Sequence, residues 1–226
     1  MSSDKEIWDD ILLASEWPIS RVQTALRQDG RSEVVAFVYD RHYERFFKPI
    51  DLLKKERDET FGFAIMALCS LLIETLQCYR EGWPSTNGGE LTNCRKDGGS
   101  LDGEYRLDDL PEKYDRGLGK QVFESFFKQY RALFPGIDGK KFYENVRNGL
   151  LHQAQTKGGW RIRTGRTQLW DEQHHIIDRN LFVCALEAAF NNYLEEVRED
   201  SPGSQALWKK ARRKILWLIE LSKDRG

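Results

Sequence analysis

Three side chains that can act together on a phosphate occur within six residues of this chain. Arg147, Asn148 and His152 lie in the stretch FYENVRNGLLHQAQ, residues 142–155, and the chain has only four histidines. A histidine titrates near neutral pH, so it can take the proton of a 2′-hydroxyl or protonate a leaving 5′-oxygen. An arginine can hold phosphate oxygens and stabilise the charge that develops on them. The pattern predicts metal-independent RNA cleavage that leaves a 2′,3′-cyclic phosphate and a 5′-hydroxyl.

The spacing predicts one helix with two faces. At about 100° per residue, Asn145, Asn148 and His152 form a polar stripe. The opposite, apolar arc contains Phe142, Tyr143, Val146, Leu150 and Ala154. Arg147 lies at the edge of that arc and points about 140° away from His152. Aiming both at one phosphate therefore requires a local distortion of the helix, or a second copy across a two-fold axis.

An arginine at the edge of an apolar arc needs an anion, because burying an unpaired charge is costly. Glu74 interrupts the most apolar run of the chain, FGFAIMALCSLLIETL, residues 61–76. Glu74 is either a buried partner of Arg147 or a rim residue that faces water. A pair would solve the burial problem of both charges, and on that ground we predict a salt bridge between them.

The segment RNGLLH resembles the R-[N/H/D]-x3-H signature of the HEPN superfamily (higher eukaryotes and prokaryotes nucleotide-binding). Chance would place Arg-Asn-x3-His in such a chain about 0.01 times. The resemblance covers roughly residues 40–200. It implies a small α-helical bundle, commonly a homodimer, that in many members is a metal-independent ribonuclease. It assigns catalytic roles to Arg147, Asn148 and His152. HEPN toxins with a nucleotidyltransferase antitoxin have a modifiable tyrosine where this chain has Ala154, so the resemblance does not extend to that switch.

Apolar periodicity predicts an all-α fold, a HEPN-like helical bundle with a small β-hairpin insert after the motif helix. A hairpin is expected over 159–170 because Trp160, Ile162 and Thr164 alternate with arginines and Gly165 can form the turn. We expect an N-terminal helical extension over 1–40, the bundle over 41–200 with a long loop over 85–118, and a basic amphipathic helix over 201–226 packed on the same domain. Helices are expected over 4–14, 18–28, 42–56, 60–82, 119–134, 138–155, 178–198 and 204–223.

Other polar residues allow two interpretations each. Arg161, Arg163 and Arg166 could line a path for RNA or form a solvated strand face. The basic segment LWKKARRKILWLIELSK, residues 207–223, could bind phosphates or simply pack its apolar side. The pair His174-His175 would suggest a metal only with a third ligand, and we expect neither a metal nor another cofactor.

Composition narrows the class of protein and its compartment. The formal charge is −1 and the pI is about 6.5, which disfavours a constitutive nucleic-acid binder but not an enzyme that contacts RNA through a local patch. The N-terminus MSSDKEIWDD has no signal-peptide character, and the run at 61–76 is too short for a membrane span. The cysteines form no CxxC pair, and Cys69 and Cys184 lie in apolar helical context, where buried, reduced thiols are expected. These features predict a cytoplasmic protein with no membrane contact.

The leading hypothesis is a HEPN-type endoribonuclease in a bacterial defence, toxin or stress role, with RNA as substrate and an antitoxin or defence-system protein as a candidate partner. We expect a homodimer whose interface lies beside residues 145–155, with both His152 side chains facing one groove. The alternative is a non-catalytic HEPN-like module that binds RNA or a nucleotide, or serves as a scaffold. A purely structural helical oligomer would leave the polar stripe without a purpose.

Overall fold

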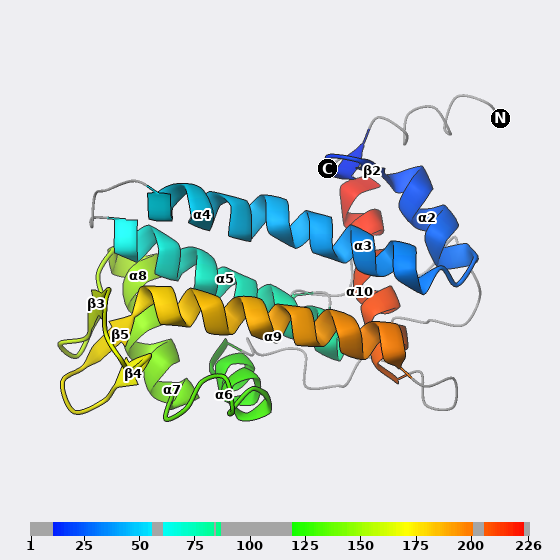
Figure 1. The fold of residues 1–226 in the computed structure, drawn as a ribbon. Helices are drawn as coiled ribbons and strands as arrows, with labels where there is room; N and C mark the ends of the chain where they lie inside the picture. Colours follow the sequence, from blue (N-terminus) through cyan, green and yellow to red (C-terminus); the bar gives the residue numbers. More distant parts are fainter. Residues whose placement is uncertain (1–10, 56–60, 84, 87–118, 201–205, 224–226) are drawn as a thin grey trace. The chain divides into compact units, whose positions relative to one another are not determined.

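The structure is a computed structural model that describes residues 11–55, 61–83, 85–86, 119–200 and 206–223 (Figure 1). The described chain is mostly helical, with two small sheets. Most of the loop expected over 85–118, and the first ten residues, lie outside this description. The chain divides into two compact units, each discontinuous in sequence, and α5 (Gly62–Glu81) and α9 (Arg179–Glu199) contribute residues to both.

The first unit is drawn from Met1–Glu44, Cys78–Gly117 and Leu194–Gly226. Its described elements are the antiparallel strands β1 (Leu12–Ala14) and β2 (Trp17–Pro18), the helices α2 (Ile19–Arg27), α3 (Arg31–His42) and α10 (Ala206–Lys223), and the ends of α5 and α9. Residues 12–14 are thus a strand, not the end of the helix expected over 4–14. The helix expected over 18–28 is confirmed as α2, and Pro18 stands immediately before it because proline needs no N–H partner there.

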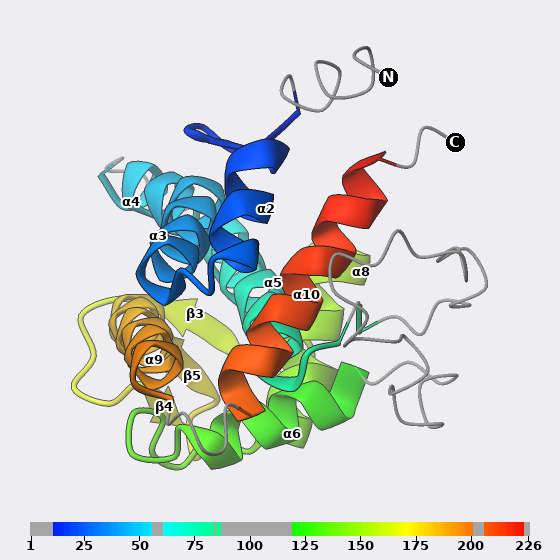
Figure 2. The ribbon, with the colours of Figure 1, turned by 90° about the vertical axis from the view of Figure 1, so that its right-hand side faces the viewer.

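Helix α10 contains the basic segment 207–223. It packs through its apolar side, which is one of the two interpretations given for that segment. Trp208, Ile215 and Ile219 are buried. The indole Nε1 of Trp208 donates to Oδ1 of Asp29 at 2.7 Å, and Arg212 Nη1 donates to the same oxygen at 3.2 Å. Asp29 follows α2, so these bonds hold α10 beside α2 (Figure 2).

The second unit comprises Arg45–Gln77 and Leu118–Tyr193. Its elements are α4 (Lys48–Lys55), most of α5, α6 (Gly119–Gln129), α7 (Gly139–Lys141), the π-helical segment η6 (Phe142–Arg147), α8 (Asn148–Gln153), a three-stranded sheet and most of α9. Aromatic side chains fill its core. The fully or almost fully buried members are Phe123, Phe126, Phe127, Phe134, Phe142 and Phe182.

Pro49 lies in a continuous helical path that contains a widened turn, and it does not divide that path. A π-helical segment, η1 (Tyr43–Phe47), joins the end of α3 to the start of α4 at Lys48. Proline has no N–H to donate, and its ring collides with the carbonyl four residues earlier in a regular helix. A turn with one additional residue moves that carbonyl away, so the helical path continues past Pro49.

The small sheet follows the motif helix, as expected, but the hairpin predicted over 159–170 is wrong. Strands β3 (Arg161–Arg163) and β4 (Trp170–Asp171) do not pair with each other. Both pair with β5 (Ile176–Asp178), which lies between them, parallel to β3 and antiparallel to β4. All three residues of β5 are buried, whereas β3 exposes two arginines, so burial places the apolar strand at the centre.

Helix α5 is the buried core helix that its sequence predicted. By length and composition alone it could cross a membrane, but 67% of its most apolar window is buried inside the protein. It ends where Gly82 adopts a φ of 69°, and Trp83 N then donates to the carbonyl of Cys78 at 2.9 Å. Cys69, on this helix, is fully buried, and burial raises the pKa of its thiol to about 12. Cys184, in contrast, is exposed, so the expectation of burial was wrong for that thiol.

Lys214 generates a testable pH dependence in the first unit. The pKa of Lys214 is lowered from 10.5 to about 8, chiefly by burial; nearby Cys78 opposes the shift and Arg41 adds to it. In the unfolded chain Lys214 keeps its proton up to the ordinary pKa of 10.5, whereas in the folded protein it loses the proton near pH 8. Burying the charge therefore costs the full penalty below pH 8, and this penalty decreases between pH 8 and 10.5.

Lys214→Met should therefore raise the free energy of unfolding by roughly 3 kcal/mol at pH 7 and by less than ~1 kcal/mol at pH 10. Urea denaturation of both proteins at the two pH values measures the difference. An equal gain at both pH values would show that the gain comes from packing and not from the buried charge.

Candidate functional site

The helix that carries the motif is not a uniform α-helix. It begins at Asp138, whose carboxylate accepts from Lys141 N at 2.9 Å, and continues through α7, η6 and α8. In η6 the N–H of Asn148 donates to the carbonyl of Tyr143, five residues back. This widened turn surrounds Arg147, so the regular spacing assumed from the sequence does not hold there. Such π-helical turns are often found at functional sites.

Arg147 is held by an anion, as predicted. Its Nε donates to Oε1 of Glu74 at 2.7 Å, and the two side chains are only 14% and 11% exposed. The guanidinium carbon also lies 5.6 Å from the centre of the Tyr143 ring, within cation–π range. The salt bridge between Glu74 and Arg147 is confirmed. Because Glu74 is buried, the other interpretation, in which Glu74 is a rim residue that faces water, is excluded.

Asn148 orients the other end of the same guanidinium. Arg147 Nη1 donates to Oδ1 of Asn148 at 3.0 Å. This bond uses the oxygen of the Asn148 amide, which leaves its NH₂ group to donate elsewhere. Arg147 is therefore fixed at Nε by Glu74 and at Nη1 by its neighbour on the chain. Within the described residues, Nη2 makes no hydrogen bond.

His152 is exposed, which confirms that it is not a core histidine. It lies in the last turn of α8, four residues after Asn148, and makes no hydrogen bond or ion pair with any described residue. The helix ends directly after Gln153, where Ala154 adopts a left-handed φ of 53°. Ala154 is exposed, so its placement on the apolar arc was wrong. Phe142, Val146 and Leu150 are buried, as that arc predicted.

Asn145 contacts the loop that follows the motif helix. Its carbonyl accepts from Lys157 N at 2.7 Å. Its Oδ1 would lie 3.0 Å from a β-carbon at Gly158, where φ is 60°, so only glycine fits the loop there without strain. Gly149 is constrained in the same way, because a β-carbon there would lie 2.4 Å from the carbonyl oxygen of Gln155. These contacts hold the loop against the helix, so the observed role of Asn145 is structural support.

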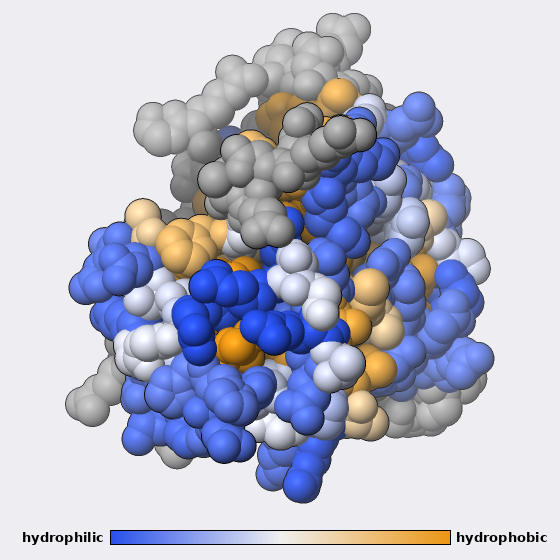
Figure 3. Space-filling model, turned by 60° about the vertical axis from the view of Figure 1, so that its left-hand side comes forward, coloured by the Kyte–Doolittle hydropathy of each residue, from blue (hydrophilic) through white to orange (hydrophobic). Residues whose placement is uncertain are grey.

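The three arginines expected near the hairpin, Arg161, Arg163 and Arg166, are all exposed, but their contacts differ. Arg161 and Arg163 project from the outer face of β3, and Arg161 Nη2 donates to the carbonyl of His174 at 2.9 Å. Arg163 Nη1 donates to the carbonyl of Ile162 at 3.0 Å. Arg166 is bound to Asp178 through its backbone N–H. Figure 3 brings the left-hand side of Figure 1 forward, and on that face strongly hydrophilic side chains surround small hydrophobic areas.

No metal cluster occurs among the residues that the structure describes: no three or more His, Cys, Asp or Glu side chains converge. His174 pairs with Asp171, Nδ1 to Oδ2 at 2.8 Å. Hydrogen bonds from His174 lower the pKa of the Asp171 carboxyl. His175 instead stacks on Trp160.

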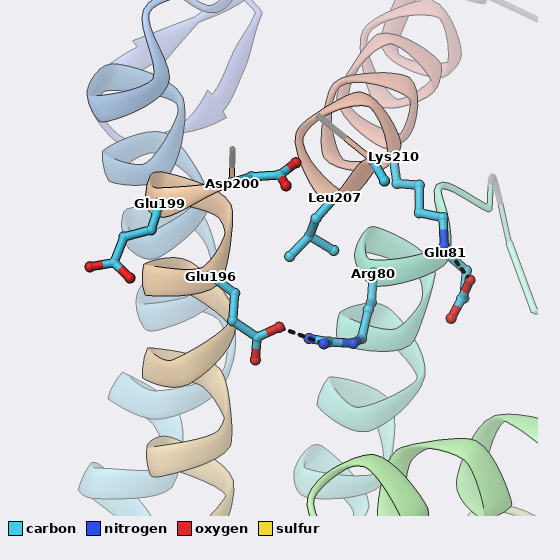
Figure 4. A pocket seen from close by; sticks show the side chains of 8 residues that line it. Arg80, Glu81, Glu196, Glu199, Asp200, Leu207 and Lys210 are labelled. Carbon is cyan, nitrogen blue, oxygen red and sulfur yellow. Dashed lines mark hydrogen bonds and ion pairs between the residues drawn. The ribbon is translucent and has the colours of Figure 1, made fainter. Parts of the chain in front are cut away.

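A separate pocket lies in the first unit, between the ends of α5 and α9 and the start of α10 (Figure 4). Its charged side chains mostly satisfy one another. Arg80 pairs with Glu196, and Lys210 Nζ lies 2.9 Å from Oε2 of Glu81. Asp200 Oδ2 accepts from Trp208 N at 2.8 Å, which ties down the start of α10. These pairs explain the charged lining as structural.

The sequence interpretation missed two aromatic features. Tyr143 was placed in the core, yet it is only half-buried and lies under Arg147. An aromatic residue four positions before an arginine on a helix is a usable signal for that contact. The stack of Trp160, Trp170 and His175 unites the residue before β3, a residue of β4 and a residue of the turn, and no spacing along the chain predicts it.

Breaking the buried pair should destabilise the second unit. Glu74→Ala strands a guanidinium in a partly buried position, so we expect the free energy of unfolding to fall by roughly 3 kcal/mol. A double-mutant cycle with Arg147→Ala measures the coupling by denaturant unfolding. The matched control is Glu81→Ala, which removes a more exposed ion pair with Lys210 and should cost less than ~1 kcal/mol. Equal losses for both variants would contradict a special role of burial.

Compared with known protein families, with curated proteins and with solved structures, the chain matches none. The likeness to HEPN proteins therefore rests on the segment RNGLLH.

Proposed function

We propose that this protein is a metal-independent endoribonuclease of the HEPN type, which cleaves RNA by attack of its own 2′-hydroxyl. One arrangement supports the proposal above all. The guanidinium of Arg147 is held by hydrogen bonds to Glu74 and Asn148, and its Nη2 makes no hydrogen bond within the described residues. An exposed histidine, His152, follows on the same helix. A helix that only packs has no need of an oriented guanidinium beside a histidine in water.

The proposed roles follow from the chemistry of each group. The guanidinium of Arg147 binds a non-bridging phosphate oxygen through Nη2 and stabilises the charge of the pentacoordinate transition state. His152 takes the proton of the 2′-hydroxyl or protonates the leaving 5′-oxygen. Asn148 can donate its amide N–H to the same phosphate. Glu74 is a positioning residue, since it contacts only Arg147 within this set.

A homodimer would bring a second Arg-His set to the cleft. Arg147 turns towards α5, whereas His152 is exposed, so a single chain separates the two groups. Two exposed leucines support an interface nearby: Leu151, beside His152, and Leu71, one turn before Glu74 on α5, are 37% and 40% exposed. Two-fold pairing over these residues would cover apolar surface and place two His152 side chains at one groove.

The wider biological setting is also part of this proposal. In this proposal the RNase acts in a defence, toxin or stress response in a bacterial cytoplasm, with an antitoxin or defence-system protein as a partner. A non-catalytic HEPN-like module that binds RNA or a nucleotide is the alternative. The near-neutral net charge of −1 disfavours stable RNA binding by such a module, because stable RNA binders are usually basic, and leaves nucleotide binding or a scaffold role as its other forms.

Substitution of the motif separates these functions. In EDTA, wild type should cleave single-stranded RNA to 2′,3′-cyclic phosphate and 5′-hydroxyl ends, and His152→Ala should be slower by ~10²–10⁴-fold. Because His152 is exposed, the variant should keep the wild-type melting temperature. His174→Ala, at an exposed histidine outside the motif, is the matched control and should remain active. Full activity of His152→Ala would reject the assignment.

Mixing two inactive variants tests the composite site. If each cleft takes Arg147 from one subunit and His152 from the other, Arg147→Lys and His152→Ala subunits should regain activity when combined, because each mixed dimer contains one intact pair. Ultracentrifugation should show a dimer, which Leu151→Glu should dissociate. An active monomer, or no recovery among dimers shown to exchange subunits, would place the whole reaction within one chain.

A further inference from the structure

A ladder of three rings leads from the core of the second unit to its surface. The rings of Trp160 and Trp170 are stacked with centroids 3.8 Å apart and an interplanar angle of 29°. His175 stacks on Trp160 at 5.1 Å and 20°. Both tryptophans are buried, but His175 is exposed. The ladder therefore ends in a ring that has an aromatic neighbour and is open to solvent.

The turn between β4 and β5 holds this ring in place at a conformational cost. His175 has a φ of 53°, which is uncommon for a residue other than glycine. Its carbonyl accepts from Arg161 N at 2.8 Å, and Arg161 Nη2 binds the preceding carbonyl. Gly159, with a φ of 73°, lies beside the ring: a β-carbon there would be in ordinary van der Waals contact with Nδ1 of His175, at 3.6 Å. Strained backbone that the surroundings maintain is concentrated at binding sites.

The ladder is tied to the motif helix through one short loop. Thr156 Oγ1 donates to the carbonyl of Trp160, and Trp160 N donates to the carbonyl of Lys157. Lys157 N in turn binds the carbonyl of Asn145 in η6. Ring and motif thus belong to one connected structure within the second unit, and His152 is eight residues before Trp160 in the chain.

The charges around the ladder favour an anionic strand. Arg161 and Arg163 are exposed on β3. The two nearest acids of the turn are occupied, since Asp171 pairs with His174 and Glu172 with Lys141. Pairing reduces their repulsion of phosphate and leaves the arginines as the dominant charge.

From this arrangement we propose that His175 is a stacking platform for one unpaired nucleobase of an RNA strand whose scissile phosphate lies at the motif. The inference rests on the proposed function and adds a subsite to it. Every nucleobase offers a π-face, so an aromatic ring beside exposed cations recognises single-stranded RNA with little sequence preference. The flanking phosphates would contact Arg161 and Arg163.

The test measures binding by the intact but non-cleaving His152→Ala protein. A fluorescein-labelled single-stranded RNA is titrated by anisotropy, with and without His175→Asn, which removes the ring while asparagine tolerates a positive φ. We expect a ~10-fold rise in Kd for His175→Asn. His175→Tyr, which retains an aromatic ring, should stay within about twofold. Gln173→Ala, at an exposed residue of the same turn outside the ladder, is the control and should not change Kd.

A set of RNAs with one abasic nucleotide identifies the stacked base. At one position, an abasic nucleotide should weaken binding to the protein that retains His175 about as much as the His175→Asn substitution does. The same abasic RNA should bind the His175→Asn protein no more weakly than the intact RNA does. Unchanged affinity of His175→Asn, or equal losses for the asparagine and tyrosine variants, overturns the platform. If wild type cleaves RNA through His152 while His175→Asn binds normally, only this inference fails. If RNA is neither bound nor cleaved, the proposed function fails as well.

Discussion

The ion pair between Glu74 and Arg147 is the constraint around which the second unit is arranged. A carboxylate within an apolar helix and a guanidinium at the edge of an apolar face would each be costly alone. Placed 2.7 Å apart, they satisfy each other and join α5 to the motif helix. The pair also fixes the rotation of that helix about its axis. Once Arg147 faces α5, the buried positions of Phe142 and Val146 and the exposure of His152 follow.

The widened turn of η6 adds a second constraint. Its extra residue places Tyr143 beneath the guanidinium and lets the carbonyl of Asn145 reach the loop at Lys157. That loop then directs the chain into β3. Gly119 shows how closely the turn is packed, because a β-carbon there would lie 2.4 Å from the hydroxyl of Tyr143. The distortion is therefore supported on several sides and is part of the folded structure.

The division of labour proposed for the motif has a physical basis. A charged group that must not move is best held by a buried carboxylate, where competition from water is small. A group that exchanges protons must keep contact with water and with substrate. Arg147 and His152 meet these opposite requirements from one helical segment, at the cost of pointing in different directions. Such divergence is the structural reason to consider a second subunit in the proposed reaction.

Several features were predictable from the sequence because they depend on local signals. Apolar periodicity indicates the helices and the buried α5, proline marks the start of α2, and a lone charge in an apolar run indicates the Glu74–Arg147 pair. The π-helical turns, the central place of β5 and the ring ladder were not predictable, since they arise where distant segments pack together. Strand order was decided by burial of Ile176 and Ile177, not by the turn at Gly165. The residue types thus determined which groups can do chemistry, and tertiary packing alone decided which are held and which remain free.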